Sequence, residues 1–285
     1  YVNILYHLKT TIYIFLRNMF NIQNIVWILL GVIYLLTVKY ENTVVFLDVG
    51  QGDATLIQEG NIQVLIDGGP DSSILYELQK YIPMYDREIE YVILTHPHDD
   101  HLVGLLHVLE RYEVGEILYF PVCYDNPNYE SLLQRYSNVI PIGRGYTIML
   151  KNIKIDVLWP VLEKEYDSCV AKYNSDLNND SLVLGFEYLK KRFLLMGDIE
   201  SDVEEVLVDQ RYVESEYDIL KAGHHCSNSS SSEKFLEIVS PSIAVCSVGE
   251  GNRFGHPGSE TVKNFKNFNV QYLITYEEGN IQIKE

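Results

Sequence analysis

The sequence predicts an α/β protein built as an αββα sandwich, with two facing sheets covered by helices on their outer sides, preceded by an N-terminal hydrophobic helix. Two observations predict the sandwich. From residue 43, short apolar runs separated by turn residues follow one another as in hairpins, and later runs alternate with segments of helical spacing. Such a mixture is typical of two sheets with helices outside. A third observation, the uncharged apolar run 25–38, predicts the separate N-terminal helix.

The first half of the sandwich opens with hairpin strands and continues with strands that alternate with helices. Glu59-Gly60-Asn61 is a hairpin signal between two of the strands, and Pro83 ends the first helix. Expected strands lie at 44–47, 54–57, 63–66, 89–94 and 116–120. Expected helices lie at 72–81, 102–112 and 128–136.

The second half begins with two strands within 146–159, joined at Lys151-Asn152. Residues 160–179 are polar, and we expect them to form a loop that crosses a site. Two further strands at 181–187 and 191–196 precede an amphipathic helix at 199–209. The last third repeats strand and helical patterns at 217–221, 231–239, 242–247, 258–267, 270–275 and 280–284.

The chain divides into two predicted regions, a hydrophobic membrane-anchor segment at residues 1–40 and a folded domain at residues 41–285. The apolar run is shorter than the roughly 20 residues that a full span needs. A signal-peptide core, the last helix of a larger membrane protein and a buried helix of a soluble protein are the alternatives. Because Lys9 and Arg17 precede the run and acidic sequence follows it, the positive-inside rule predicts that the folded domain lies outside the cytoplasm.

The chain is strongly acidic, with 40 Asp and Glu against 22 Lys and Arg and a formal net charge of −18. This charge repels phosphate backbones, so we expect no tight nonspecific binding of duplex DNA.

The four cysteines are widely spaced and contain no C-x-x-C pair, so we expect no zinc site made of thiolates. A disulfide is compatible with them, but its pairing cannot be read from sequence. We predict ordinary buried residues at Cys123, Cys169, Cys226 and Cys246.

The chemistry of the chain centres on His96-Pro97-His98-Asp99-Asp100-His101, directly after the apolar strand at 89–94. Imidazole nitrogens and carboxylate oxygens both bind zinc, and histidine also suits manganese, iron and nickel. Alternate residues of an extended segment project the same way, so His96 and His98 can share one ion. Asp100 and His101 then turn toward a neighbouring position, where a second ion could sit.

Further polar residues follow other predicted strands at their C-terminal ends. Asp198 follows an apolar strand, is well placed to bridge two ions, and has Gly197 before it to allow close backbone approach. The pair His224-His225 follows the strand at 217–221, and one of the two can complete the second ion's ligands. His256 lies in a turn that opens a helix, where substrate contact or proton transfer is expected. We expect no role for His7 or His107.

Together these segments resemble the metallo-β-lactamase superfamily, and within it the metallo-hydrolase domain of the ComEC/Rec2 competence proteins. The resemblance covers roughly residues 43–285. It is carried, in order, by Phe46-Leu47-Asp48-Val49-Gly50-Gln51-Gly52-Asp53-Ala54, the His96–His101 cluster, Leu195-Met196-Gly197-Asp198, Lys221-Ala222-Gly223-His224-His225 and Gly255-His256-Pro257. In that family the domain follows a polytopic DNA-uptake channel, so residues 1–40 would be its last helix or a stand-alone anchor.

The resemblance implies a site with two divalent metal ions, with zinc or manganese expected. His96 and His98 would bind the first ion, Asp100, His101 and His225 the second, and Asp198 would bridge them. Asp67 would orient a ligand histidine, and Asp48 and Asp53 would do the same.

Two departures from the family pattern stand out. The superfamily's further histidine before the bridging aspartate is missing, and Asn178-Asn179-Asp180-Ser181 occupies that region, as in the competence branch. Cys226 replaces the glycine expected after the histidine pair, either as a soft ligand or as a small residue.

The resemblance implies a phosphodiesterase or nuclease that acts outside the cytoplasm in DNA uptake, with single-stranded DNA as an expected substrate. Asp100 would accept a proton, and His256 or His224 would contact the phosphate or protonate the leaving oxygen. Two alternatives remain open: hydrolysis of another ester, thioester or lactam, and a non-catalytic membrane-tethered module with a structural metal. The missing histidine argues against the first, and the number of candidate ligands argues against the second.

Overall fold

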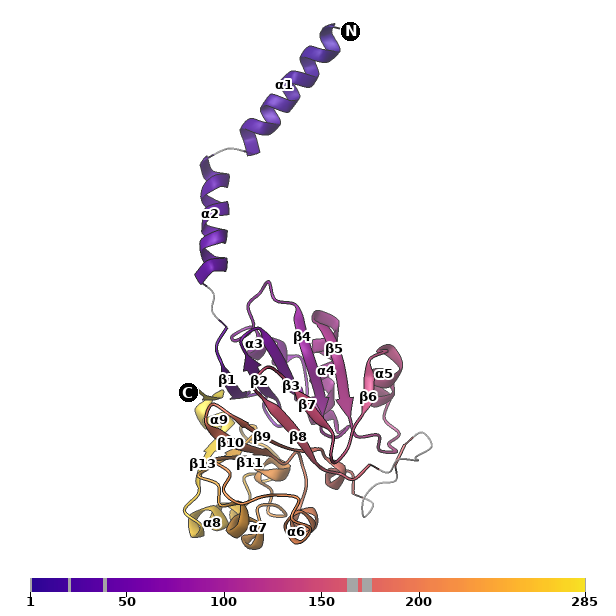
Figure 1. Ribbon diagram of the computed structural model, residues 1–285, viewed down its shortest axis with the longest axis vertical. Coiled ribbons are helices and arrows are strands. Elements are labelled where there is room, and N and C mark those ends of the chain that lie inside the picture. Colours follow the sequence, from indigo (N-terminus) through magenta and orange to yellow (C-terminus); the bar gives the residue numbers. More distant parts are fainter. Residues whose placement is uncertain (1, 20–21, 38–39, 163–168, 171–175, 285) are drawn as a thin grey trace. The chain divides into compact units, whose positions relative to one another are not determined.

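The computed structural model describes residues 2–19, 22–37, 40–162, 169–170 and 176–284 and is shown in Figure 1. The chain separates into two compact units, Tyr1–Lys39 and Tyr40–Glu285. Part of the loop predicted at 160–179, residues 163–168 and 171–175, lies outside the described residues.

The first unit contains two helices, α1 (Val2–Met19) and α2 (Ile22–Thr37). The second helix includes the apolar run that predicts an N-terminal helix, and its side chains from Ile25 to Ile33 are exposed. In the part of the chain that the structure describes, neither helix is both long and apolar enough to traverse a bilayer.

The first sheet of the second unit mixes hairpins with parallel strands. Among the described residues its strand order is β14-β1-β2-β3-β4-β5-β6. The pairs within β14-β1-β2-β3 are antiparallel, and the pairs from β3 to β6 are parallel. The bounds are β1 (Thr43–Phe46), β2 (Thr55–Glu59), β3 (Ile62–Ile66), β4 (Glu88–Leu94), β5 (Glu113–Tyr119), β6 (Val139–Pro141) and β14 (Ile281–Ile283). Parallel pairing requires crossover connections, which are α3 (Ser73–Leu78), α4 (Asp99–Arg111) and α5 (Pro127–Arg135).

The second sheet has the order β13-β12-β11-β10-β9-β8-β7 within the described ranges. Its strands are β7 (Thr147–Met149), β8 (Lys154–Trp159), β9 (Val183–Tyr188), β10 (Lys191–Leu195), β11 (Ile219–Lys221), β12 (Ile243–Cys246) and β13 (Gln271–Ile274). Here the parallel strands β10 to β13 are joined through α6 (Ser201–Asp209), α7 (Glu233–Val239) and α8 (Ser259–Asn267). Short helices lie at η2 (Asn178–Asp180), η3 (Gly223–Cys226) and α9 (Thr275–Glu278).

Alternation of side chains along the strands builds three apolar layers. On β4, Ile93 joins the core between the two sheets, whereas Val92 and Leu94 join the core under α3, α4 and α5. The central core includes the stacked rings of Phe186 and Phe193, whose centroids are 4.8 Å apart. A third cluster lies between the second sheet and α6, α7 and α8. Because its last three residues, 92–94, are buried on both faces, the C-terminal half of β4 is a continuous apolar run. The predicted αββα sandwich is confirmed.

The structure corrects several expectations. Helix α4 begins at Asp99 and not at residue 102, and β6 and α9 were not predicted. The prediction of unpaired buried cysteines is wrong, because Cys123 bonds to Cys169 and Cys226 to Cys246. Cys226 is therefore not a metal ligand, since its sulfur is bonded to the sulfur of a residue 20 positions along the chain.

Candidate metal centre

The histidine cluster follows the C-terminal end of β4, in the centre of the first sheet. His98 is the residue before α4, so Asp100 and His101 lie in the first turn of that helix. Carboxylates are favourable there because the helix dipole is positive at its N-terminus. His101 faces inward and is fully buried, while Asp100 is only partly covered.

Asp198 reaches the same place from the end of β10. The residue before it, Gly197, has φ +52°, and a Cβ atom there would lie 2.6 Å from Cβ of Ser181. Only glycine therefore allows this approach. The Ser181 hydroxyl oxygen accepts a hydrogen bond of 3.0 Å from the backbone N–H of Asp198. In the segment 178–181, where the family resemblance implies a further histidine, Ser181 thus holds the backbone of the aspartate by a hydrogen bond instead.

His225 lies in a turn after β11 that has unusual backbone geometry. His224, His225 and Cys226 have φ values of 45°, 51° and 58°, in the left-handed region that disfavours residues with a Cβ atom. The disulfide to Cys246 ties the turn to β12, and Cys226 O accepts a hydrogen bond of 2.7 Å from Gly258 N. These links hold the turn and direct His225 at Asp198.

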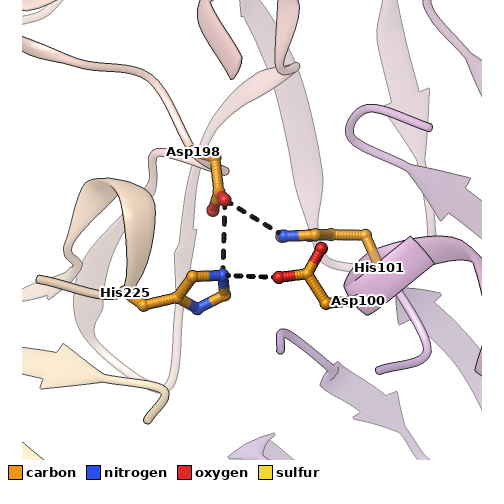
Figure 2. A group of neighbouring side chains, drawn as sticks. All are labelled: Asp100, His101, Asp198 and His225. Carbon is orange, nitrogen blue, oxygen red and sulfur yellow. Dashed lines mark ion pairs between the residues drawn. The ribbon is translucent and has the colours of Figure 1, made fainter. Parts of the chain in front are cut away.

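Four side chains converge where these elements meet, as Figure 2 shows. Oδ2 of Asp198 lies 3.3 Å from Nε2 of His101 and 3.3 Å from Nε2 of His225. The same His225 nitrogen lies 3.3 Å from Oδ2 of Asp100. One donor atom from each residue lies within 4.8 Å of the other three. His101, His225 and Asp198 are exposed by only 0%, 1% and 2%.

The outer nitrogen of each buried histidine is held by a partner. Nδ1 of His101 lies 2.8 Å from Oδ2 of Asp67, and Nδ1 of His225 donates to the carbonyl oxygen of Ser247 at 2.9 Å. Because Nδ1 is the donor in both, Nε2 is the nitrogen directed at the cluster. Asp67 thus stands where the sequence predicts an orienting residue.

The cluster fits a cation. Among the described residues, Nε2 of His101, Nε2 of His225 and Oδ1 of Asp198 are buried and have no hydrogen-bond partner. Buried polar atoms are nearly always paired in folded proteins. Two imidazole nitrogens and carboxylate oxygens form a donor set that suits zinc or manganese.

His96 and His98 form a second pair beside this group. Nε2 of His96 lies 3.0 Å from Nδ1 of His98 and 3.9 Å from Oδ2 of Asp198. Two nitrogens bound to one tetrahedral zinc ion lie about 3.3 Å apart, given Zn–N bonds of about 2.0–2.1 Å. Burial lowers the pKa of both histidines, which favours the neutral form that a metal binds. The structure therefore places His96 and His98 beside the other four predicted ligands, and the assignment of all six as ligands remains a prediction.

The buried histidines and Asp198 shift one another's pKa values. Burial alone would lower the pKa of His101 and His225, but the neighbouring carboxylates together outweigh burial and raise both pKa values well above the usual range. These carboxylates are Asp198 and Asp67 for His101, and Asp198 and Asp53 for His225. Burial would likewise raise the pKa of Asp198, yet the two histidines hold it well below its usual range.

Sequence reasoning overlooked Lys221, the last residue of β11. Its buried ammonium pairs with Asp53, donates to Gly197 O at 2.9 Å and lies 3.8 Å from Oδ1 of Asp198. Asp53 Oδ1 also lies 3.3 Å from Nδ1 of His225, so the expectation that it acts behind the site agrees with its position. The sequence did contain a sign of this role, because a lysine at the end of an apolar strand is expected to have a buried partner. Asp48 instead accepts a hydrogen bond from Gly50 N in its own turn.

His224 and His256 lie at the rim and not in the buried cluster. Nδ1 of His224 lies 2.9 Å from Oε1 of Glu200, another residue that the sequence analysis overlooked, two positions after Asp198. The ring of His256 lies 5.5 Å from the ring of His224. Burial and the charges on His224 and His225 lower the pKa of His256 to about 4. Both side chains can therefore face a substrate held at the cluster.

Comparison with known proteins agrees with this geometry. Residues 47–250 match the sequence profile of the metallo-beta-lactamase superfamily. ComE operon protein 3 of Bacillus subtilis is 27% identical over 268 residues, covering 86% of this chain and 33% of its own length. Competence protein ComA of Neisseria gonorrhoeae is 26% identical over 246 residues, covering 85% of this chain and 32% of its own length. The chain thus spans about a third of the length of these relatives.

A solved structure shares the fold. The metallo-beta-lactamase fold protein YhfI from Bacillus subtilis superposes with a TM-score of 0.55 at 13% identity, covering 85% of this chain and 99% of that protein.

Proposed function

Because the chain belongs to the metallo-β-lactamase superfamily, we propose that residues 41–285 form a metal-dependent hydrolase of phosphodiesters, a nuclease of the competence type. One observation carries the proposal: buried Asp198 faces His101 and His225, whose Nε2 atoms are directed at it and have no hydrogen-bond partner among the described residues. A buried group of this kind, partly open at Asp100, suits a reactive site better than a closed structural one.

The ligands would divide into two sets. His96 and His98 would hold one ion, Asp100, His101 and His225 the other, and Asp198 would contact both. When bound, divalent ions at such a site act as Lewis acids toward phosphate oxygens and lower the pKa of bound water toward neutral pH.

The chain's own residues supply the remaining chemistry. Asp100 has its pKa lowered to about 2 by His225 and His101 despite its burial, so it is ionised at neutral pH, as a ligand or hydrogen-bond acceptor must be. Its expected role as proton acceptor requires that its pKa rise when the site is occupied. His224, held by Glu200, can contact a phosphate oxygen or protonate the leaving oxygen from the rim. His256 lies beside His224, and its pKa of about 4 leaves the ring neutral at neutral pH, so it is suited to contact a phosphate oxygen and not to protonate the leaving oxygen.

The segment at 178–181 bears on the alternatives. Hydrolysis of an ester, thioester or lactam would use the same cluster, but here Asn179 and Ser181 bind backbone N–H groups of Glu200 and Asp198 in place of the missing histidine. A non-catalytic, membrane-tethered metal-binding module is the remaining alternative. A closed four-ligand site would not need His96, His98 and the rim histidines as well.

We further propose that the domain acts outside the cytoplasm in DNA uptake, attached to a membrane through residues 1–40 and working with a channel domain or partner. The two disulfides support the location, since disulfides persist in oxidising compartments. The net charge of −18 disfavours tight binding of duplex DNA, so we expect single-stranded DNA delivered locally as the substrate.

The test uses the full chain in detergent. Metal per chain is measured, together with manganese- or zinc-dependent cleavage of bis-p-nitrophenyl phosphate and of single-stranded DNA, with His98→Ala as the control variant. Two metals per chain and cleavage that the variant loses are expected. A chain that binds no metal and cleaves neither substrate would contradict the proposal, and metal binding without cleavage would favour the non-catalytic module.

A further inference from the structure

A short loop beside the candidate metal centre exposes a phenylalanine. Phe254 lies between β12 and α8, two residues before His256, and is 56% exposed. Its ring centroid lies 5.8 Å from that of His256, with the ring planes 27° apart. The His256 ring in turn lies 6.4 Å from the buried His225 ring at 25°. Each ring is thus inclined by 25–27° to the next, and the three rings form a series from the buried cluster to the surface.

The loop is held in this conformation by one side chain. Asn252 Nδ2 donates to the carbonyl oxygens of Gly249 and His256, at 3.2 and 2.7 Å. Its Oδ1 accepts from the N–H groups of Phe254 and His256, at 3.2 and 3.0 Å. These four hydrogen bonds hold the backbone on both sides of Phe254. The exposed ring is therefore carried by a preorganised loop.

A cation lies next to this ring. The Arg253 guanidinium carbon is 5.0 Å from the Phe254 centroid, within the range of a cation–π contact. An exposed aromatic side chain with an arginine over its ring is a combination that binds single-stranded nucleic acid, because bases stack on aromatic rings and phosphates pair with the cation. Arg253 places positive charge locally on a protein whose net charge is −18.

We propose that Phe254 and Arg253 form a nucleobase-stacking subsite beside the metal centre. This inference rests on the proposed function and deepens it, because it assigns the residues that would bind a base next to the scissile phosphate of a single-stranded substrate. A partner protein or a lipid surface would also contact an exposed phenylalanine. Because the Phe254 ring continues a series with His256 and His225 into the cluster, we favour a substrate group bound at the metal centre over a protein or lipid partner.

The experiment compares two single-stranded oligonucleotides, one of thymidines and one of the same length with abasic positions, in the full chain with manganese. Stacking of one base on an aromatic side chain corresponds to a preference on the order of 5- to 100-fold in kcat/KM. Phe254→Ala is expected to remove this preference and Phe254→Trp to retain it. The matched control is Tyr85→Ala, an aromatic residue 43% exposed that precedes the start of β4, at the opposite end of that strand from His96.

A second readout does not depend on turnover. Fluorescence of an oligonucleotide containing 2-aminopurine is expected to be quenched by the Asp100→Asn chain and not by Asp100→Asn combined with Phe254→Ala. Equal cleavage of thymidine and abasic oligonucleotides by the unmodified chain would overturn the subsite while leaving the phosphodiesterase intact. Absence of metal binding and of all cleavage would instead contradict the proposed function. If Phe254→Ala loses binding to vesicles or to a protein partner while it keeps the base preference, the subsite is also wrong.

Discussion

Nδ1 of His101 lies 2.8 Å from Oδ2 of Asp67, although 34 positions separate the two residues. Asp67 also accepts hydrogen bonds from Thr95, from the N–H at 2.8 Å and from the hydroxyl at 2.7 Å. The carboxylate is therefore fixed by the residue that follows β4 and in turn fixes His101 at the start of α4. This arrangement points Nε2 of His101 at Asp198 before any ion arrives.

Replacing Asp67 should weaken metal binding without removing a ligand. In Asp67→Asn we expect a 10- to 100-fold loss of affinity, the usual cost of removing a partner that orients a ligand histidine. Competition with a coloured chelator measures the affinity directly. Asp71→Asn is the control, because the exposed Asp71 carboxylate binds Ser73 N in the same segment. Equal affinity in Asp67→Asn and the unmodified chain would show that His101 needs no orienting partner.

Lys221 should be required for stability more than for chemistry. Removing one partner of a buried ion pair leaves a charge uncompensated and costs about 3–5 kcal/mol. We expect Lys221→Met to lower the free energy of unfolding by this amount in urea titration, because Asp53 and Asp198 then lose their shared cation.

Two further variants check this account of Lys221. Combining Lys221→Met with Asp53→Asn should restore part of the stability, since both charges are then absent. Lys154→Met, at an exposed pair with Asp156, should cost less than about 1 kcal/mol. A Lys221→Met chain as stable as the unmodified one would contradict a compensating role.

The two disulfides should differ in their effect on metal binding. The Cys226–Cys246 loop spans 20 residues, so removing the bond should cost about 3 kcal/mol of stability. Replacing both cysteines by alanine should also weaken binding at His225, because the left-handed turn loses its link to β12. The matched variant without Cys123–Cys169 should lose stability but keep its metal affinity. If both variants bind metal equally well, the hydrogen bond to Ser247 alone positions His225.

Most of the sandwich and the gathering of the site were predictable because both follow from local patterns. Strand residues buried on both faces form a continuous apolar run, as in the C-terminal half of β4, and the residues that follow it carry the chemistry, as His96 does. The same reasoning places Asp198 and His225 after β10 and β11. Parallel pairing with a helical crossover brings the ends of β10 and β11 to one edge of the second sheet. The cluster after β4 belongs to the first sheet, so its meeting with Asp198 depends on how the two sheets pack face to face.

The remainder depends on contacts between distant segments that no local pattern encodes. Cysteine pairing requires knowing that the turn at Cys226 lies against β12, and a sequence with no C-x-x-C pair offers no such information. In the sequence Lys221 is only the last residue of a predicted strand. Its role depends on Asp53, which the first sheet brings beside it. Strand β6 is three residues long and contains Pro141, which disfavours a strand assignment.

A final prediction concerns the pH dependence of metal binding, which follows from the protonation of His101 and His225. Asp198 raises both pKa values well above the ordinary 6.5 in the metal-free chain, against the effect of burial, so both rings carry an extra proton at neutral pH. An ion that binds Nε2 must displace that proton, so metal uptake should release protons and the apparent affinity should fall as the pH falls.

At a site of ordinary histidines the affinity levels off above about pH 6.5, whereas here it should continue to rise with pH beyond that value. Calorimetry in buffers of different ionisation enthalpy counts the released protons, and titrations at several pH values give the slope. In Asp198→Asn the raised pKa values should return toward the ordinary range, since the carboxylate that holds the protons is gone. Its remaining affinity should then level off near the ordinary value. An unmodified chain whose affinity stops changing above pH 6.5 would show that the two histidines are neutral before the metal binds.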